Sequence, residues 1–489
     1  MNTYELLSTL KVKTIYGELP SNISNLHVDS RKVQAGDIFI CTRGFTVDGH
    51  DYALDAVEKG AVLIVAEKQL DINLEKAALV VVKDTFKAMG QLVNKYYDYP
   101  SMKMNVFGVT GTNGKTSVTN LIHSILRKDG QSSALSGTIG FDLNGELFPS
   151  ENTTCDVMTN QEMIQKALDR NIENMVLEVS SHGLTLGRLW GVDFDVVTFT
   201  NLSHDHLDYH QTMEHYGYAK GLLFSQLGQD LSRPKYAVLN SDDEWYERYS
   251  KMTAHEIISY GLESYADFKA EKISYYNDLT AFTLHSPEGT FAVESKLLGK
   301  FNVYNLLAAM ATLFAKGMSV EKLVKIIKEL PPVNGRMEKV TSEAPLSIYI
   351  DYAHTPDAIE NAIQSVLPFK ENKIIFLVGT GGNRDKSKRP AMAEKASIAD
   401  YVILTTDDPR YESYDSIVND LGKGMIHNDF ALIGDREEAV KHAIDVSEPG
   451  DIIIFAGKGH EDYQIIENTK YPHSDKEIAI QRCKEKYNL

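Results

Sequence analysis

The feature that most constrains the fold of this chain is a strand, a glycine turn and a helix that follow one another within residues 104–126. Residues 104–110 are mostly apolar or β-branched, which predicts a buried strand. The turn is Gly111-Thr-Asn-Gly-Lys-Thr116, and apolar residues then recur with the spacing of a helix face, at Val118, Leu121, Ile122, Ile125 and Leu126. Glycines let backbone N–H groups approach an anion, and a helix N-terminus adds partial positive charge. The stretch therefore predicts a phosphate-binding loop.

Two side chains of this loop have the chemistry of a nucleotide site. Lys115 supplies a mobile ammonium group, and the Thr116 hydroxyl is a suitable ligand for Mg²⁺. The loop departs from the G-x-x-x-x-G-K-[ST] pattern because Val109 stands where the first glycine is expected. A glycine-rich turn without function is the alternative, and the flanking strand and helix argue against it.

Composition limits the classes of partner. The 489 residues suggest about two to four domains. The formal net charge of −18 makes a nucleic-acid surface an unsuitable main function. An acidic protein that binds phosphates must do so with local basic groups and metal ions, so we expect small-molecule substrates.

Cysteine usage and hydropathy indicate the compartment. Three cysteines, Cys41, Cys155 and Cys483, are scattered without metal-ligand spacing, as is typical of free thiols in a reducing compartment. The N-terminal sequence lacks a signal-peptide pattern, and no apolar run approaches the ~20 residues of a membrane span. We expect a cytoplasmic protein.

Alternating strand and helix patterns predict an α/β protein of three domains. We place an N-terminal domain at residues 1–100, a central domain with a mainly parallel sheet at 101–333, and a further α/β domain at 334–489. Pro331-Pro332 marks the second boundary. Within the central domain, residues 255–300 predict antiparallel strands because their side chains alternate.

Polar clusters follow two predicted strands of the central domain. Glu178 stands at one strand end, and residues 203–208 contain His204, Asp205, His206 and Asp208 after another. Ligand residues of α/β sheets gather at such ends, and Mg²⁺ needs few protein ligands, so we interpret the clusters as metal ligands rather than solvated side chains.

Other residues allow two interpretations. Asp29-Ser30-Arg31 is either a solvated turn or, beside Arg43 and Gly44, an anion site. Asn302 and Asn305 either cap a helix or face a ligand. An isolated helical lysine such as Lys220 is by default exposed.

The third predicted domain places both signs of charge in loops after its strands. Arg384 and Arg410 lie beside Asp407, Asp408 and Glu461 in the predicted topology. This combination suits a zwitterionic amino acid, whose carboxylate arginine binds bidentately and whose ammonium group an acid accepts. Surface ion pairing is the alternative.

Five motifs in this order resemble those of the Mur ligases of peptidoglycan synthesis: Gly111-Thr-Asn-Gly-Lys-Thr116, Glu178-Val-Ser-Ser-His182, Asp205-His-Leu-Asp-Tyr-His210, Asp351-Tyr-Ala-His-Thr-Pro356 and Gly457-Lys-Gly-His-Glu461. The resemblance extends from Asp29 to Glu461 and is narrowest to the members that add the third residue of the stem peptide. It implies three domains: one for the UDP-sugar, a central ATPase and a C-terminal Rossmann-like domain.

The resemblance also implies the reaction. ATP would phosphorylate the free carboxylate of UDP-N-acetylmuramoyl-L-alanyl-D-glutamate, and the amine of a diamino acid would attack the acyl phosphate. ATP and Mg²⁺ are the implied cofactors, and we expect a monomer. A folylpolyglutamate synthase, which should lack the N-terminal domain, and a non-catalytic UDP-sugar-binding paralogue are the rival interpretations.

The family's functional residues map onto this sequence as expectations. Those for ATP are Gly111, Thr112, Asn113, Gly114, Lys115, Thr116, Ser117, Asn302, Asn305, Arg336 and Asp351. Those for the UDP-sugar are Ser30, Gly44, Phe45, Thr46, Asn152, Thr153, Thr154, Ser180 and Arg188. The implied catalytic residues are Lys115, Glu178, His206 and Lys220. The implied metal ligands are Thr116, Glu178, His206 and Lys220, the last as a carbamate.

The amino acid is predicted from the third domain, where the implied contacts are Arg384, Asp407, Asp408, Pro409, Arg410, Gly457 and Glu461. In the family, Asp-Asn-Pro-Arg accompanies meso-diaminopimelate, and its arginine binds the distal carboxylate. Arg410 is present here, which favours diaminopimelate over L-lysine or another diamino acid. Asp408 replaces the family's asparagine, and Thr380-Gly-Gly-Asn383 departs from the usual Cys-Gly-Gly-Asp.

Overall fold

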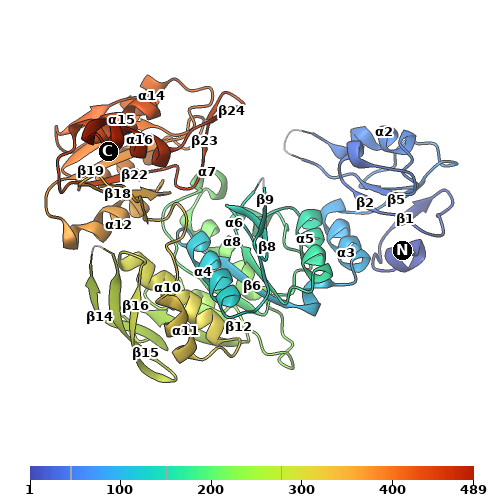
Figure 1. The fold of residues 1–489 in the computed structure, drawn as a ribbon. Helices are drawn as coiled ribbons and strands as arrows, with labels where there is room; N and C mark the ends of the chain where they lie inside the picture. Colours follow the sequence, from blue (N-terminus) through green and yellow to red (C-terminus); the bar gives the residue numbers. More distant parts are fainter. Residues whose placement is uncertain (45–46, 150–151, 277) are drawn as a thin grey trace. The chain divides into compact units, whose positions relative to one another are not determined.

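The computed structural model describes residues 1–44, 47–149, 152–276 and 278–489 (Figure 1). The chain divides into two compact units, each built from separate segments. The first unit contains residues 1–108, 131–195 and 219–235, and the second contains residues 109–130, 196–218 and 236–489. Strand β6 (Asn105–Thr110) carries the chain from one unit to the other.

The N-terminal part of the first unit is a five-stranded sheet between helices. Its order is β1 (Thr14–Tyr16), β5 (Ala78–Val81), β4 (Leu63–Ala66), β3 (Ile38–Ile40) and β2 (Leu26–His27). All neighbours are parallel except β1 and β5. Leu63 and Val65 pack with α1 (Thr3–Leu7) and α3 (Thr85–Tyr96), whereas Ile64 packs with α2 (Ala53–Glu58). Strand alternation therefore fills both faces of this sheet.

The rest of the first unit surrounds two parallel strands. β10 (Asn174–Glu178) pairs with β7 (Ser133–Gly137), which continues antiparallel into β8 (Gly140–Leu143) and β9 (Glu146–Phe148). Helix α5 (Val157–Asp169) packs beside α3, and α6 (Ser181–Thr185) begins after β10. Glu178 is the last residue of β10, as predicted.

The second unit begins with parallel strands and ends its first sheet with a hairpin. β11 (Val196–Phe199), β12 (Tyr236–Asn240), β13 (Glu256–Gly261) and β14 (Phe268–Tyr275) are parallel neighbours. β15 (Thr280–Ser286) and β16 (Gly289–Ser295) are antiparallel, as predicted. β14 is antiparallel to β15, as predicted, but its pairing with β13 is parallel and there the prediction was wrong. The Asp242 carboxylate accepts the N–H groups of residues 262–264 and holds that segment as a loop instead of a hairpin turn.

Helices of this part position the phosphate loop. α4 (Lys115–Lys128) packs against α10 (Lys300–Phe314), and α10 lies on strands β11 to β14. The remaining helices are α7 (Leu207–His210), α8 (Met213–Ser225), α9 (Tyr246–Ser250) and α11 (Val320–Ile327).

The C-terminal sheet is the middle layer of a three-layer α/β structure. Its order is β17 (Glu338–Lys339), β18 (Ser347–Asp351), β22 (Ile452–Ala456), β19 (Ile374–Thr380), β20 (Tyr401–Thr406) and β21 (Phe430–Leu432). One face packs on α12 (Pro356–Val366), α13 (Lys388–Ala396) and α14 (Tyr414–Gly422), and the other on α15 (Arg436–Val446) and α16 (Asp475–Tyr487). A hairpin of β23 (Tyr463–Ile466) and β24 (Thr469–Pro472) follows β22. Because β18, β19, β20 and β22 are parallel, their carboxyl ends share one edge.

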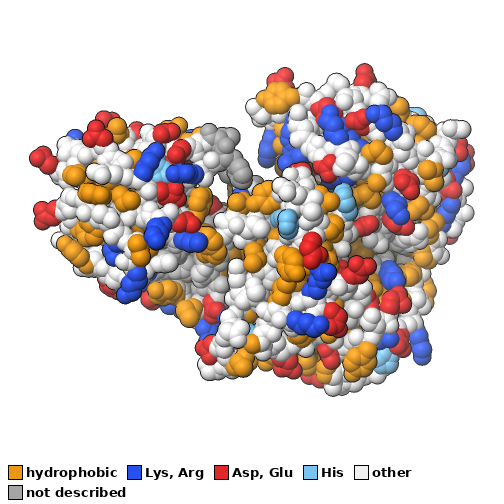
Figure 2. Space-filling view, turned by 180° about the vertical axis from the view of Figure 1, so that it is seen from behind, with side chains coloured by type: hydrophobic (Ala, Val, Ile, Leu, Met, Phe, Trp, Pro, Cys, Tyr) orange, Lys and Arg blue, Asp and Glu red, His pale blue; other side chains and the backbone are white. Residues whose placement is uncertain are grey.

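Surface and core features agree with the composition. Within the described part of the chain, no helix is long and apolar enough to cross a membrane. Acidic and basic side chains are interspersed on the face shown in Figure 2. Cys41, Cys155 and Cys483 are buried free thiols, as predicted.

Candidate functional site

The phosphate loop contains two glycines at positive φ, where other residues are disfavoured. Gly111 has φ +153°, and a Cβ there would lie 1.8 Å from Thr200 Oγ1. Gly114 has φ +88°, and its Cβ would lie 2.6 Å from Asn305 Oδ1. Gly114 is also the N-cap of α4 and has no side chain with which to cap it. This is the arrangement expected where an anion takes the place of a cap.

Neutral hydrogen bonds from the exit of β11 hold the loop in shape. Asn113 N–H donates to Asn201 Oδ1 at 3.0 Å, and Asn201 Nδ2 donates to the Asn113 carbonyl at 3.1 Å. Thr200 Oγ1 donates to the same carbonyl at 2.6 Å, and Thr112 N–H donates to the Asn201 carbonyl at 2.7 Å. Hydrogen bonds within the protein therefore hold the loop in this conformation.

The two side chains with nucleotide chemistry lie on this loop. Lys115 Nζ donates to the carbonyls of Gly111 and Thr112 at 3.0 and 2.9 Å, so its ammonium group lies over the loop. Thr116 is buried, and its Oγ1 accepts a hydrogen bond from Arg336 Nη2 at 3.1 Å. Arg336 Nε is buried and has no hydrogen-bond partner among the described residues. An orphaned guanidinium nitrogen beside a phosphate loop fits a nucleotide phosphate.

The amides on α10 lie beside the loop. Asn305 Nδ2 donates to Asn302 Oδ1 at 2.9 Å, and Asn302 Nδ2 donates to the Leu298 carbonyl at 2.9 Å. The N-cap of α10 is Gly299, so the helix-cap alternative for the two asparagines was wrong. The contact with Gly114 described above brings Asn305 to the loop, as the ligand interpretation requires.

Asp351 has backbone partners. Its Oδ2 accepts from Met337 N–H at 2.7 Å and its Oδ1 from Ala353 N–H at 2.8 Å. Burial raises the pKa of Asp351, although Arg336 lowers it. These contacts anchor the segment that carries Arg336, and a nucleotide contact of Asp351 stays a prediction.

Glu178 in the first unit lies in an oxygen-rich cluster. Its Oε1 accepts from Thr138 N–H and its Oε2 from Thr138 Oγ1, both at 3.1 Å. Thr138 Oγ1 is 3.0 Å from Thr153 Oγ1. A Cβ on Gly137 would lie 2.2 Å from Glu178 Oε1, so only glycine fits beside this carboxylate. A buried carboxylate among hydroxyl groups has the hard oxygen ligands that Mg²⁺ prefers.

Two of the predicted UDP-sugar residues, Ser180 and Arg188, contact a third, Thr154. Its Oγ1 donates to the Glu178 carbonyl at 2.8 Å and accepts from Ser180 N–H at 2.9 Å. Arg188 Nη1 donates to the Thr154 carbonyl at 2.9 Å. Asn152 is exposed nearby in sequence. These residues therefore belong to one local cluster with Glu178.

The predicted N-terminal UDP residues are described only in part. Asp29 and Arg31 form an exposed bidentate pair at 2.9 Å, which lowers the pKa of Asp29 to about 2. Ser30 between them is buried, and Gly44 N–H donates to the Val47 carbonyl. Phe45 and Thr46 lie outside the described residues. Asp29 and Arg31 satisfy each other, as in the solvated-turn alternative.

The remaining predicted metal ligands differ in burial. His206 is exposed, with Nε2 3.5 Å from Asp205 Oδ2. Burial raises the pKa of the Asp205 carboxyl. Nearby positive charges, chiefly those of His206 and Lys388, together lower it by more, so the pKa lies below its usual value. Lys220 on α8 is only 1% exposed, so the default of an exposed lysine was wrong. Within the described ranges, no group of three or more His, Cys, Asp or Glu side chains could hold a metal.

The C-terminal loops contain a buried ionic network. Arg436 is 1% exposed and donates to both oxygens of Asp475 at 2.9 and 2.7 Å. It also donates to Asp407 Oδ1 at 2.5 Å. Burial raises the pKa of Asp407 to about 6, although Arg436 and Lys458 lower it. Asp407 is therefore a structural ion partner as well as a predicted ligand contact.

Asp408, Arg410 and Glu461 share a second set of contacts around Lys458. The buried Lys458 ammonium donates to Asp408 Oδ1 at 2.9 Å and to Glu461 Oε2 at 2.7 Å. Arg410 Nη2 is 3.7 Å from Asp408 Oδ2, and its Nη1 donates to the Gly382 carbonyl at 3.3 Å. The structure therefore brings these predicted residues together.

The other predicted amino-acid residues lie on the same loops. Gly457 would place a Cβ 2.5 Å from Asp407 Oδ1, and the Pro409 carbonyl would lie 1.9 Å from a Cβ on Gly382. Arg384 is exposed, and its Cγ lies 3.6 Å from the Cβ position of Gly381. Arg410 Nη1 lies 3.1 Å from that same position. Two arginines therefore flank Gly381.

Sequence reasoning missed three side chains of this network: Arg436, Lys458 and Asp475. Arg436 is 29 residues from Asp407 and 39 from Asp475, and Lys458 is 50 residues from Asp408. No local pattern marks such partners. The parallel strand order was the available signal, because it brings the loops after β20 and β22 to one edge.

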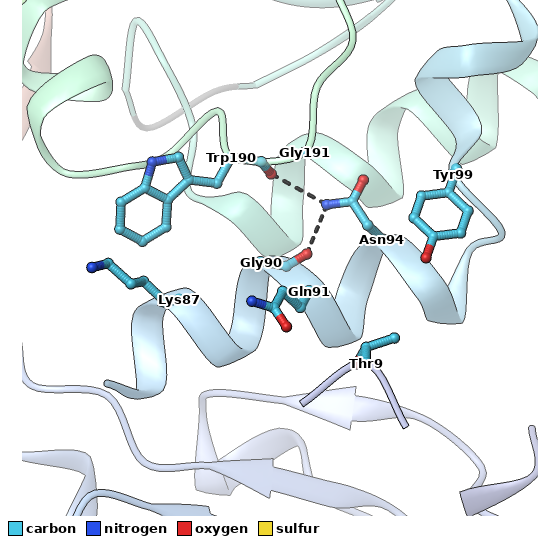
Figure 3. A pocket seen from close by; sticks show the side chains of 8 residues that line it. All are labelled: Thr9, Lys87, Gly90, Gln91, Asn94, Tyr99, Trp190 and Gly191. Atoms are coloured by element: carbon cyan, nitrogen blue, oxygen red, sulfur yellow. Dashed lines mark hydrogen bonds between the residues drawn. The ribbon is translucent and has the colours of Figure 1, made fainter. Parts of the chain in front are cut away.

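A separate pocket of about 630 Å³ in the first unit contains none of the predicted site residues (Figure 3). Its lining residues are Thr9, Lys87, Gly90, Gln91, Asn94, Tyr99, Trp190 and Gly191. Asn94 Nδ2 donates to the carbonyls of Gly90 and Trp190 at 2.7 and 3.2 Å and so joins α3 to the segment that follows α6.

Comparison with known proteins agrees with this geometry. Three family models match: Mur ligase family, catalytic domain at residues 22–97; Mur ligase middle domain at 109–313; and Mur ligase, glutamate ligase domain at 335–459. UDP-N-acetylmuramyl-tripeptide synthetase 2 of Oceanobacillus iheyensis is 52% identical over 483 residues, covering 98% of each chain. UDP-N-acetylmuramoyl-L-alanyl-D-glutamate--L-lysine ligase of Staphylococcus haemolyticus is 44% identical over 488 residues, covering 100% of this chain and 99% of that one.

A solved structure extends the comparison over the whole chain. The structure of a UDP-N-acetylmuramoyl-L-alanyl-D-glutamate--2,6-diaminopimelate ligase aligns with a TM-score of 0.72 and 32% identity, covering 100% of both chains. The three-domain α/β architecture is therefore shared, while the relatives' names differ in the amino acid.

Proposed function

The chain belongs to the Mur ligase family, among the UDP-N-acetylmuramyl-tripeptide synthetases, and on this premise we propose that it joins a diamino acid to UDP-N-acetylmuramoyl-L-alanyl-D-glutamate at the expense of ATP. One observation carries the proposal. A preformed phosphate loop bearing Lys115 and a cluster of acids and bases at parallel strand ends occur in the same compact unit. The chain therefore has residues suited to phosphate transfer and residues suited to binding an amino acid.

The first step must bring two anions together. The γ-phosphate of ATP and the substrate carboxylate repel each other, so cations have to offset their charge. Lys115 can swing from the loop carbonyls to the phosphates, and Arg336 has a buried Nε–H available for an oxygen. The carboxylate becomes an acyl phosphate, ADP leaves, and the amine of the amino acid then displaces phosphate.

The resemblance to the family implies the metal ligands, and we propose them because their chemistry suits the role. Thr116 and Glu178 offer hard oxygen atoms, His206 an exposed imidazole, and Lys220 a buried amine. Burial disfavours an ammonium ion, and reaction of Lys220 with CO₂ would convert it into a metal-binding carbamate. Mg²⁺ held there would offset phosphate charge.

We place the proposed UDP-sugar contacts in the cluster around Thr154. Thr153, Ser180 and Arg188 lie about that residue and would contact the diphosphate and the sugar-peptide. Asn152, Ser30 and Gly44 to Thr46 complete the proposed set.

Arg410 supports meso-diaminopimelate as the amino acid. Its guanidinium is partly exposed and has only a 3.7 Å approach to Asp408 as an ion pair, which leaves it able to bind a second carboxylate. L-Lysine is the second candidate, since the 44% identical relative is named as an L-lysine ligase. Lysine has no distal carboxylate, and Glu461 or Asp408 would then receive its side-chain ammonium group.

One assay tests both levels of the proposal. ADP release is measured with the UDP-dipeptide and either meso-diaminopimelate or L-lysine. We expect release to require the dipeptide and to be faster with diaminopimelate. Arg410→Ala should abolish this preference, whereas Arg482→Ala, at a partly exposed arginine of α16, should preserve it. ADP release independent of both substrates would reject the ligase, and faster release with L-lysine would reverse the order of the two amino acids.

A further inference from the structure

Tyr352, the residue after β18, contacts two segments of the proposed site, one carrying Arg336 and one carrying His460 and Glu461. The Arg336 Cζ lies 4.5 Å from the centre of its ring, and the His460 ring stacks on it at 5.6 Å with an interplanar angle of 30°. Its hydroxyl donates to Glu461 Oε1 at 3.4 Å. Tyr352 is named in no part of the proposed binding or catalytic set.

The arginine on the ring reaches the phosphate loop. Arg336 Nη2 donates to Thr116 Oγ1 at 3.1 Å, so one guanidinium contacts both the loop and the Tyr352 ring. A cation over an aromatic face is attracted by the ring quadrupole. A phosphate arriving beside Thr116 would meet the Arg336 guanidinium, whose buried Nε has no hydrogen-bond partner among the described residues. Nucleotide binding should therefore depend on where the Tyr352 ring holds Arg336.

The hydroxyl end of Tyr352 is equally fixed. Burial raises the pKa of Tyr352, so the phenol stays protonated and donates to Glu461. The other carboxylate oxygen of Glu461 accepts from Lys458 at 2.7 Å. The Tyr352 hydroxyl thus helps to orient an acid of the proposed amino-acid site.

Two glycines bring the supporting backbones into direct contact. Gly335 has φ +66°, and its Cβ would lie 2.2 Å from the His460 nitrogen. Gly459 has φ +54°, and its Cβ would lie 2.9 Å from the Gly335 carbonyl oxygen and 2.8 Å from Tyr352 Cβ. A shift of the segment that carries Arg336 would therefore displace the segment that carries Glu461.

We propose that Tyr352 is a positioning residue that couples occupancy of the phosphate loop to the amino-acid loops, through Arg336 on its ring and Glu461 at its hydroxyl. The inference rests on the proposed function, since it takes Glu461 as an amino-acid contact. An amino acid that fixes Glu461 would hold Tyr352 and Arg336 in place and tighten nucleotide binding. Thermodynamic linkage requires that the nucleotide tighten amino-acid binding by the same factor.

The test measures the factor by which a bound amino acid tightens nucleotide binding. The Kd of MgADP is determined by calorimetry with the UDP-dipeptide present, with and without a saturating amino acid, using meso-diaminopimelate and L-lysine in parallel. We expect the amino acid to tighten MgADP binding about tenfold in the wild type. Tyr352→Leu, which removes ring and hydroxyl, should reduce the factor to below about twofold, and Tyr352→Phe should give an intermediate value.

Tyr349→Phe is the matched control. Tyr349 is a fully buried tyrosine of β18 that packs in the hydrophobic core, so its variant should keep the wild-type factor. Should Tyr352→Leu fail to fold, Tyr352→Phe decides, with a threefold or larger rise in the KM for the amino acid at saturating ATP and less than a twofold change in kcat. A wild-type factor near one, or Tyr352 variants with an unchanged factor, would overturn the coupling. Wild-type enzyme that shows the coupling but no ligation would instead reject the proposed function.

Discussion

The phosphate loop and the amino-acid loops achieve order by different means. The phosphate loop, residues 111–117, is held by neutral hydrogen bonds from Thr200 and Asn201 and by two glycines that no other residue can replace. The amino-acid loops, residues 381–388, 407–410 and 457–461, are held by buried ions, chiefly Arg436 and Lys458. We propose that both regions bind charged ligands, and the second also uses buried ion pairs for its own architecture.

Because of this difference, substitutions in the two regions should affect different properties, catalytic activity in one and stability in the other. The phosphate loop is held by hydrogen bonds from Thr200 and Asn201 that do not involve the Lys115 ammonium group. Removing a cation of the amino-acid loops instead leaves its acidic partners buried without their counter-ion. Equivalent substitutions should therefore lose activity in one region and folding in the other.

Lys115→Ala should have the largest effect. We expect kcat to fall by about a thousandfold or more, because electrostatic stabilisation of the transferring phosphoryl group is lost. The melting temperature should stay close to that of the wild type. Steady-state ADP release and a thermal unfolding scan measure both quantities.

Lys128→Ala is the matched control for that variant. Lys128 lies on the same helix and forms an exposed pair with Glu329 at 2.8 Å. Its loss should change neither activity nor stability. Substantial activity of Lys115→Ala would contradict the assignment of the loop, and unfolding of that variant would contradict the comparison between regions.

Arg436→Met should mainly reduce stability. The substitution keeps apolar volume but leaves Asp407 and Asp475 without their shared cation, so we expect a loss of about 3 kcal/mol in the free energy of unfolding. Urea denaturation measures it. Arg482→Met removes a partly exposed pair with Asp445 and should cost less than about 1 kcal/mol. Equal losses in the two variants would show that the buried network contributes no special stability.

The same contrast explains what the sequence could predict. The phosphate loop is contiguous, so glycine spacing and helix periodicity were enough to locate it, its strand and its helix. Glu178 was also predictable, because it ends a strongly apolar strand. The strand alternation over Thr280–Ser286 and Gly289–Ser295 correctly predicted a hairpin.

The amino-acid loops were predictable only through topology. Arg410 and Asp408 could be named from their local motif, but Arg436 reaches Asp407, and Lys458 reaches Asp408, only when the parallel sheet is assembled. Burial was missed for the same reason. Lys220 is in an unremarkable helical pattern, which carries no sign that its side chain is 1% exposed.

Asp407→Asn should alter how stability depends on pH. Because burial raises the pKa of Asp407 to about 6 from 3.8, its stabilising contribution is complete below about pH 4 and is lost as pH rises through 6. The wild type should therefore lose about 2 kcal/mol relative to Asp407→Asn between pH 4 and pH 7. Urea unfolding at several pH values measures the difference.

The exposed Asp415 provides the control for that pH experiment. Asp415→Asn should show the same pH profile as the wild type, because its carboxylate lies at the surface of α14. A difference between wild type and Asp407→Asn that stays constant from pH 4 to pH 7 would exclude a proton bound to Asp407 in the native state.

Asp408→Asn should give the smallest effect and the sharpest information on the amino acid. Its Oδ2 lies 3.7 Å from Arg410 Nη2, so removing the negative charge frees the guanidinium for a second carboxylate, while the asparagine Oδ1 can still accept from Lys458 and from Ile465 N–H. Partly exposed ion pairs of this kind contribute below about 1 kcal/mol, so we expect the kcat/KM ratio of meso-diaminopimelate to L-lysine to rise about two- to fivefold. Asp429→Asn, at an exposed position before β21, should leave the ratio unchanged. A fall in the ratio would mean that Asp408 itself contacts the distal ammonium group of diaminopimelate, and the specificity would then lie in the acid and not in Arg410.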